Sequence, residues 1–312
     1  GRCQTHRRWR ERKERFGHMI QMDGSHHDWL EGRGPKLVLM GYVDDATNTV
    51  YGRFYEYEGT IPALASLKGY IERYGIPASI YLDWHSTYKN RDKRRYDIDP
   101  WDPENQRKSQ FARACSDLGV VLIYANSPQA KGRIERVFRT LQDRLVKELR
   151  LAGVKTIEEA NIVLERFWVV FNKRFTIKAK KAGDVHRKVP IGLDLHEILC
   201  IQQERVLRND NTIMYQGQWY QITSKTKAKR VVVREHVGGN IAITYRGHTL
   251  AYTILPGQLQ KDKEKIRKGK RRRKVVIVSK DHIWRYFKLP GSLPIKKDMH
   301  KCPRNNDLKR AA

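Results

Sequence analysis

The sequence predicts an α/β domain built on a mixed five-stranded sheet with helices, followed by a small all-β barrel. Over residues 16–175, short apolar strands alternate with helical patterns, which is typical of a sheet covered by helices. Beyond Asp184, short strands separated by turn residues take over. The chain has 312 residues, of which 39% are hydrophobic and 10% aromatic, and this is enough material for more than one core.

Three strands are expected first, over residues 18–24, 36–43 and 49–56. Residues 44–48 read Asp-Asp-Ala-Thr-Asn and are rich in turn formers, so we expect the second and third strands to form an antiparallel hairpin. A helix is predicted over residues 61–74, because apolar residues recur there at a helical period.

The second half of this domain contains two more strands and three helices. A fourth strand is expected at 79–82, and a polar, irregular insertion follows at 88–106. A helix at 110–118 then leads into a fifth strand at 120–124, which we expect to be buried because all five of its residues are apolar or aromatic. Two helices complete the domain, one beginning after Pro128 and carrying an apolar stripe from Ile134 to Leu149, the other spanning residues 157–171.

The C-terminal part is predicted to be a barrel of about five antiparallel strands, because turn signals such as Asn209-Asp-Asn and Gly238-Gly-Asn recur there. Its aromatic residues Tyr215, Trp219 and Tyr220 could stack on bases, although packing in the barrel core is the favoured interpretation. The expected organisation is a basic arm or linker, a core, a linker, a barrel and a basic tail, over residues 1–15, 16–175, 176–205, 206–256 and 257–312.

The charge of the chain indicates a polyanionic partner. Lys and Arg number 63 against 34 Asp and Glu, a formal net charge of +29. Residues 1–15 and 261–274 account for +13 of it, so basic residues are also spread over the folded body. Nucleic acid is therefore favoured over an anionic membrane or an acidic protein. No apolar run has the roughly 20 residues of a membrane span, and no signal peptide is recognisable, which argues against a transmembrane or secreted protein.

Three acidic residues occupy positions where they could act together. Asp23 lies inside the first strand, Asp83 ends the fourth, and Glu135 lies beside the apolar stripe of the helix after the fifth strand. In a sheet of order 3-2-1-4-5 the first and fourth strands are neighbours, so the three carboxylates could converge. Converging carboxylates repel, and Mg²⁺, which prefers oxygen ligands, relieves that repulsion and holds phosphate oxygens.

Each of these residues also has an ordinary interpretation when taken singly. A lone Asp at a strand end is usually a turn residue, and a lone Glu on a helix is usually a solvated charge. Asp44, Asp45 and Glu148 are rival candidates, but the first two belong to a predicted turn and Glu148 lies nearly four helical turns beyond Glu135.

Local sequence favours the functional interpretation. The segments Ile20-Gln-Met-Asp-Gly-Ser25, Tyr81-Leu-Asp-Trp-His-Ser-Thr-Tyr88 and Asn126-Ser-Pro-Gln-Ala-Lys-Gly-Arg-Ile-Glu-Arg136 resemble the three blocks of the DDE transposases and integrases, which share an RNase H-like, retroviral-integrase-like core. The third block is the most specific. The resemblance covers about residues 15–175 and is closest to bacterial insertion-sequence transposases of the ISNCY type.

The resemblance implies that Asp23, Asp83 and Glu135 are catalytic and bind two Mg²⁺ ions, with Mn²⁺ as a substitute. It also implies a small β-barrel after the core. The Asp83–Glu135 interval of 52 positions is longer than in many integrases, and the insertion at 88–106 explains the excess. The helix-turn-helix region of the family has no counterpart in this chain, so whether such a region precedes it stays open.

Basic and polar residues near these blocks are candidate DNA contacts. Lys131 and Arg139 lie one turn either side of Glu135 and could hold a phosphate, with salt pairing to Glu135 as an equal alternative. Gln129 is a further DNA candidate, whereas Asn126 is a better candidate for a helix cap. His85 and Ser86 could shape the site, and Arg271, Arg272 and Arg273 provide phosphate contacts in the tail.

The resulting hypothesis is a Mg²⁺-dependent DDE transposase that cleaves DNA at transposon ends and transfers the strand into target DNA. Its expected partners are transposon-end DNA, target DNA and at least one further copy of the chain, in the nucleoid of a bacterial cytoplasm. An RNase H-like nuclease without strand transfer and a non-catalytic, domesticated DNA-binding protein are the alternatives.

Overall fold

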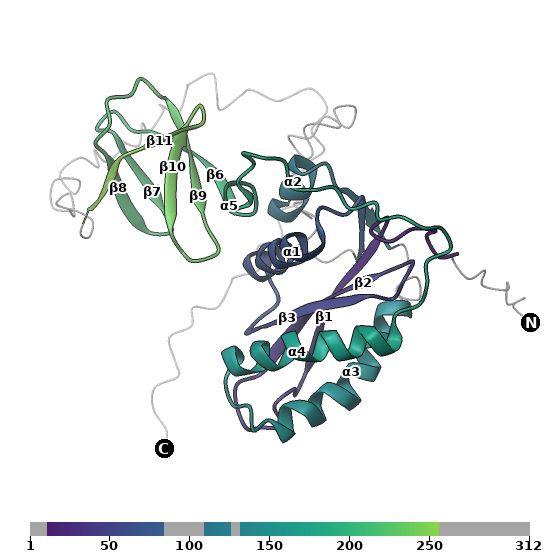
Figure 1. The fold of residues 1–312 in the computed structure, drawn as a ribbon. Coiled ribbons are helices and arrows are strands. Elements are labelled where there is room, and N and C mark those ends of the chain that lie inside the picture. Colours follow the sequence, from purple (N-terminus) through teal and green to yellow (C-terminus); the bar gives the residue numbers. More distant parts are fainter. Residues whose placement is uncertain (1–10, 84–108, 126–131, 256–312) are drawn as a thin grey trace, which may run out of the picture. The chain divides into compact units, whose positions relative to one another are not determined.

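The computed structural model describes residues 11–83, 109–125 and 132–255 (Figure 1). Its first sheet has the predicted strand order, β3-β2-β1-β4-β5. The first three strands pair antiparallel, and β4 and β5 run parallel to β1. The strands are β1 (Ile20–His27), β2 (Leu37–Asp44), β3 (Val50–Tyr55), β4 (Ser79–Leu82) and β5 (Val121–Tyr124).

Helices cover both faces of this sheet (Figure 1). They are α1 (Thr60–Tyr74), α2 (Gln110–Asp117), α3 (Gly132–Leu151) and α4 (Ile157–Phe175). On one face, α1 and α2 pack on Ile20 and Met22 of β1. On the other face, α3 and α4 pack on Leu39 and Phe54. Side chains alternate along a strand. Because Ile20 and Met22 face α1 and α2, Gln21 and Asp23 point towards α3.

Close packing of α3 on the sheet depends on one glycine. A Cβ atom at Gly41 would lie 2.5 Å from the ring of Phe138 on α3. Gly41 pairs with Asp23 across β1 and β2. The absence of a side chain therefore lets α3 lie against the strands beside Asp23.

The expectation of a buried fifth strand is wrong. Val121 is 61% exposed, and the other residues of β5 are only half-buried. The strand lies at the edge of the sheet, where only one neighbour covers it. Its apolar sequence resembles that of a central strand, but edge position is decided by the order of strands and not by composition.

The segment predicted as a linker after the core is hydrogen-bonded to the end of the basic arm and to the start of the core. The backbone N–H of Lys181 donates to the carbonyl of Glu14, and that of Val185 donates to Phe16. Further on, Leu195 and Leu199, in and just after the short helix α5 (Leu195–Ile198), join the cluster beneath α1 and α2.

An all-β region follows, with seven described strands instead of the five expected. They are β6 (Ile201–Val206), β7 (Thr212–Tyr215), β8 (Gln218–Ile222), β9 (Arg230–Glu235), β10 (Ile241–Tyr245), β11 (His248–Leu250) and β12 (Tyr252–Leu255). They pair as a four-stranded sheet, β11-β10-β9-β6, and a three-stranded sheet, β12-β8-β7. Both sheets contribute to one hydrophobic cluster that includes Ile213, Tyr220, Val233 and Ile243.

Several predicted segments lie outside the described residues, namely most of the basic arm, the insertion at 88–106 and the tail at 257–312. Among the helices that are described, none has both the length and the apolar character needed to cross a bilayer.

Candidate active site

Asp23 and Asp83 occupy matching positions on neighbouring strands. In the parallel pair β1–β4, Ile20 is level with Ile80 and Gln21 with Tyr81. The same register continued by two residues brings Asp23 level with Asp83, directly after the last residue of β4. Side chains at matching positions of paired strands point to the same face. If β4 continued on this register, the Asp83 carboxylate would point to the same face of the sheet as that of Asp23.

Helix α3 is attached to β1 on both sides of Asp23. The backbone N–H of Ile134 donates to Gln21 Oε1 at 3.3 Å, and Gln142 Nε2 donates to Ser25 Oγ at 3.2 Å. Gln21 and Ser25 are each two residues from Asp23, so all three share the face towards α3. Glu135, adjacent to Ile134 in the first described turn of α3, lies on the helix that covers this face.

The three acidic residues differ in exposure. Asp23 and Asp83 are half-buried, whereas Glu135 is exposed to solvent. Asp23 Oδ1 accepts a hydrogen bond from the backbone N–H of Gly24 at 3.1 Å. Within the described ranges, no three His, Cys, Asp or Glu side chains lie close enough together to hold a metal ion as they stand. As described, the side chains of Asp23, Asp83 and Glu135 therefore do not form a metal site by themselves.

Asp45, a buried residue of the predicted turn, links the strands to α3. Asp45 has no exposed surface. It accepts hydrogen bonds from Gln21 Nε2 at 3.0 Å and from the backbone of Lys13 at 2.8 Å. It also forms an ion pair with Arg133, in the first described turn of α3. The Gln21–Asp45–Arg133 network thus holds the start of α3, next to Glu135, against β1.

The other rival carboxylates have structural or solvent-exposed positions. Asp44 is 2% exposed and accepts hydrogen bonds from the backbones of Gly17, Ala46 and Thr47, and from the Thr47 hydroxyl. Burial raises the pKa of Asp44 above its ordinary value of 3.8, while these donors act in the opposite direction. Glu148 lies on an exposed part of α3.

The candidate DNA contacts are only partly described. Arg139 is exposed on α3, and no ion pair joins it to Glu135 in the described part of the chain. The remaining predicted residues lie outside the described ranges, and these are His85, Ser86, Asn126, Gln129, Lys131, Arg271, Arg272 and Arg273.

The aromatic residues of the all-β region mostly pack in its core. Tyr215 is 1% exposed and Tyr220 is 5% exposed, as the favoured interpretation expected. Trp219 is half-buried, and the guanidinium of Arg208 lies 4.1 Å from the centre of its ring. A stacking surface for bases is therefore not provided by the two tyrosines.

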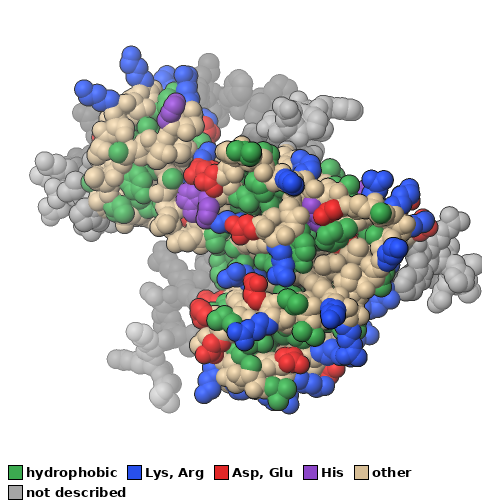
Figure 2. Space-filling model, in the orientation of Figure 1, with side chains coloured by type: hydrophobic (Ala, Val, Ile, Leu, Met, Phe, Trp, Pro, Cys, Tyr) green, Lys and Arg blue, Asp and Glu red, His purple; other side chains and the backbone are tan. Residues whose placement is uncertain are grey.

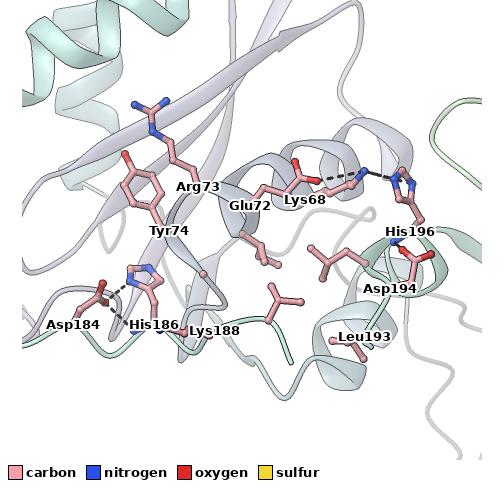
Figure 3. Close-up of a pocket in the computed structure, with 14 residues that line it drawn as sticks. Lys68, Glu72, Arg73, Tyr74, Asp184, His186, Lys188, Leu193, Asp194 and His196 are labelled. Atoms are coloured by element: carbon pink, nitrogen blue, oxygen red, sulfur yellow. Dashed lines mark hydrogen bonds and ion pairs between the residues drawn. The ribbon is translucent and has the colours of Figure 1, made fainter. Parts of the chain in front are cut away.

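A cavity of about 730 Å³ lies apart from these carboxylates, between α1 and residues 184–196 (Figure 3). The His186 ring lies against Asp184, with Nδ1 and Oδ1 2.6 Å apart. Lys68 Nζ lies 2.6 Å from Nε2 of His196 across the cavity. None of the three candidate catalytic residues lines it, so it is separate from the candidate active site.

Comparison with known proteins finds similarity to transposases. The chain is 32% identical over 252 residues to the putative transposase y4bF of Sinorhizobium fredii, a match that covers 78% of this chain and 54% of that protein. It is 33% identical over 221 residues to the transposase for insertion sequence IS1202 of Streptococcus pneumoniae, covering 70% of this chain and 45% of the other. The chain is a relative of insertion-sequence transposases.

The chain spans about half the length of the transposases it matches. No protein-family model matches it. Its resemblance to these transposases agrees with that indicated by the three sequence blocks.

Solved structures similar to the chain include retroviral integrase catalytic cores. The catalytic core of BIV integrase matches with a TM-score of 0.35 and 19% identity, over 55% of this chain and 90% of that one. The HTLV-2 integrase core in complex with magnesium matches with a TM-score of 0.36 and 17% identity, over 48% of this chain and 84% of that one. These scores are low, so the fold assignment rests on strand order and register.

Proposed function

We propose that this chain is the catalytic part of a DDE transposase, which cleaves DNA at transposon ends and transfers the strand into target DNA. The observation that carries the proposal is the β1–β4 register, which makes Asp23 and Asp83 neighbours beneath the helix that bears Glu135. The transposase relatives support it.

The proposed cofactor is a pair of Mg²⁺ ions, with Mn²⁺ as a substitute. The donor set has the chemistry that Mg²⁺ prefers, because Asp23, Asp83 and Glu135 offer only carboxylate oxygens. When bound, the ions would activate water and stabilise the attacking and leaving oxygens of an in-line displacement. Glu135 is exposed to solvent, and bound cations would offset the repulsion between its carboxylate and those of the two aspartates.

The chain's own residues would position the reacting DNA. Gln21, Asp45 and Arg133 would hold the start of α3 so that Glu135 faces the strand ends. The exposed side chain of Arg139 lies one turn beyond Glu135 and would contact a phosphate. Further contacts with DNA are proposed for Gln129, Lys131 and the tail residues 271–273.

The proposed partners are transposon-end DNA, target DNA and at least a second copy of the chain, working in the bacterial nucleoid. A second copy is required because one Asp23–Asp83–Glu135 set acts on one strand at a time. The proposed organisation remains a basic arm, a core, a linker, a barrel and a basic tail, with boundaries at residues 15, 175, 205 and 256. The net charge of +29 supports the DNA partners.

Oligonucleotide duplexes carrying the sequences that flank the gene provide the test. We expect metal-dependent cleavage and covalent joining to a second duplex. Cleavage without joined products would favour an RNase H-like nuclease. Binding without cleavage under Mg²⁺ or Mn²⁺ would favour a non-catalytic DNA-binding protein.

Metal binding can be tested without activity. Titration calorimetry with Mn²⁺ should detect binding to the unmodified chain and a marked loss in Asp23→Asn. Glu148→Gln, which changes an exposed carboxylate on the same helix as Glu135, is the matched control and should bind as the parent does. Equal binding by all three would contradict the metal assignment.

The tail is tested by salt dependence. Deleting residues 258–312 should weaken DNA binding for every sequence and flatten the dependence of affinity on salt, because each lost phosphate contact removes about 0.9 from the log–log slope. An unchanged slope would show that the tail makes no phosphate contacts.

A further inference from the structure

The outer face of α4 carries apolar side chains in an unusual position for a surface helix. Ile162 is 57% exposed and Val169 is 62% exposed. The helix already buries a separate face in the core, formed by Ala160, Leu164, Trp168 and Phe171. In Figure 1, α4 crosses the front of the sheet, and Figure 2 shows hydrophobic, acidic and basic side chains mixed over that part of the surface. The outer face of α4 therefore carries apolar residues in addition to the face that packs in the core.

Six residues form this outer stripe, and all of them are exposed. Because each helical residue advances by about 100°, they lie within a stripe roughly 100° wide along the helix. In chain order the stripe reads acidic, apolar, acidic, basic, apolar, basic. Its members are Glu158, Ile162, Glu165, Arg166, Val169 and Lys173.

This order is complementary to itself when the helix is reversed. If two copies of α4 pack antiparallel about a two-fold axis between Glu165 and Arg166, Ile162 of each copy faces Val169 of the other. The same operation sets Glu158 opposite Lys173 and Glu165 opposite Arg166, each pair occurring twice. Such a patch suits an isologous interface, in which one surface meets its own copy. Antiparallel packing also aligns the two helix dipoles favourably.

The charged members of the stripe are available for such contacts. In the part of the chain that the structure describes, Glu158, Arg166 and Lys173 take part in no ion pair. Glu165 contacts Arg73 at 3.5 Å and is still 60% exposed, so its carboxylate can accept a second cation. Pairing would neutralise these charges and cover the apolar residues between them.

We infer that the outer face of α4 is the contact surface between two copies of this chain, packed antiparallel along the stripe Glu158–Lys173. The inference is independent of the proposed catalysis, because none of the three candidate catalytic residues belongs to the stripe. A single helix pair buries less than the roughly 1,200 Å² of a stable complex, so the dimer is weak in free solution.

Analytical ultracentrifugation over a range of concentrations, without DNA or metal, tests the interface. The unmodified chain should show a concentration-dependent dimer. Val169→Glu should weaken it by about tenfold or more, because the change adds two buried charges across the two-fold axis. Leu151→Glu, at an 83% exposed position on α3 outside the stripe, is the matched control and should leave the dimer unchanged.

Charge reversal tests the antiparallel arrangement. Glu158→Lys alone and Lys173→Glu alone should each weaken the dimer, because each creates two like-charge contacts. The two changes combined in one chain should restore the affinity to near that of the unmodified protein. A combined variant as weak as either single variant would overturn the antiparallel pairing, and a monomer at all concentrations would overturn the interface itself.

Cross-linking provides a readout that does not depend on affinity. With Cys3 and Cys302 replaced by Ser, a chain carrying Ile162→Cys and Val169→Cys should form covalent dimers on mild oxidation, since opposed Cβ atoms in such a helix pair fall within disulfide reach. Cys115 and Cys200 are buried and should not interfere. A Leu151→Cys chain should stay monomeric, and equal cross-linking of both would contradict the proposal.

Discussion

Two pairs of aspartates in the same sheet have opposite environments. Asp44 and Asp45 are 2% and 0% exposed and are surrounded by hydrogen-bond donors. Asp23 and Asp83 are half-buried, and the register of the neighbouring strands β1 and β4 leads to both of them. A buried carboxylate satisfied by several donors contributes to the fold, whereas a half-buried carboxylate keeps contact with solvent. Residue type is the same in both pairs, so the difference between them lies in their environment, and the chemical role belongs to the proposal for Asp23 and Asp83.

The largest expected effect comes from the partly exposed pair. Asp23→Ala, Asp83→Ala and Glu135→Ala should each lower cleavage and joining by about a thousandfold or more, because metal ions contribute several kcal/mol of charge stabilisation and each tenfold is about 1.4 kcal/mol. Gel assays of labelled duplexes measure this, with DNA binding as the control that should persist. Activity in Glu135→Ala together with its loss in Glu148→Ala would reassign the helical carboxylate.

Asp45 should show the opposite profile, with a large loss of stability. Asp45→Ala leaves the partly buried Arg133 without this ion-pair partner and removes an acceptor from Gln21, so the free energy of unfolding should fall by about 3–5 kcal/mol. Urea unfolding measures the change. Asp143→Ala, which breaks an exposed i,i+4 pair with Lys147, is the control and should cost at most about 0.5 kcal/mol. An equal loss of unfolding free energy in Asp45→Ala and Asp143→Ala would show that the buried ion pair stabilises the fold no more than the exposed one.

A smaller, pH-dependent effect is expected for Asp44. Its folded-state pKa is raised, so the folded protein holds this proton more tightly than the unfolded chain does. The contribution of Asp44 to stability should therefore fall as pH rises from about 3.8 through the raised pKa, and stay low above it. The stability difference between the unmodified chain and Asp44→Asn, measured by urea unfolding at a series of pH values, should show this fall. A stability difference that grows with pH would mean that the hydrogen-bond donors lower the pKa of Asp44 by more than burial raises it.

The smallest effect concerns two arginines on α3. Arg133 is paired with buried Asp45, whereas Arg139 is exposed. Arg139→Ala should change the free energy of unfolding by no more than about 0.5 kcal/mol, yet lower the log–log salt slope of DNA binding by about 0.9. Binding titrations at several salt concentrations measure the slope. An unchanged slope would leave Arg139 as a solvated surface charge.

Much of the fold could be predicted from local patterns. The strand order 3-2-1-4-5 and the hairpin after residue 44 were expected and are present. The apolar stripe of α3, which includes Phe138 and Leu145, is buried as its period predicted. Local patterns suffice here because a helix or strand must bury one face, and the period of its apolar residues records that face.

The environment of individual side chains depended on tertiary structure. The apolar β5 is an exposed edge strand, and the predicted turn residues Asp44 and Asp45 are among the most buried polar groups in the described chain. Neither outcome has a local signal. Exposure at an edge depends on which strands pair, and burial of Asp45 depends on residues as distant in sequence as Lys13 and Arg133.

The sequence by itself determined the elements of the α/β core, the α/β class, the basic charge and the three acidic blocks of this protein. Only the tertiary structure decided that Asp23 and Asp83 stand level on neighbouring strands and that Asp45 holds the start of α3. The physical reason is that composition and periodicity are properties of neighbouring residues, whereas register and burial arise when segments more than 50 residues apart pack together.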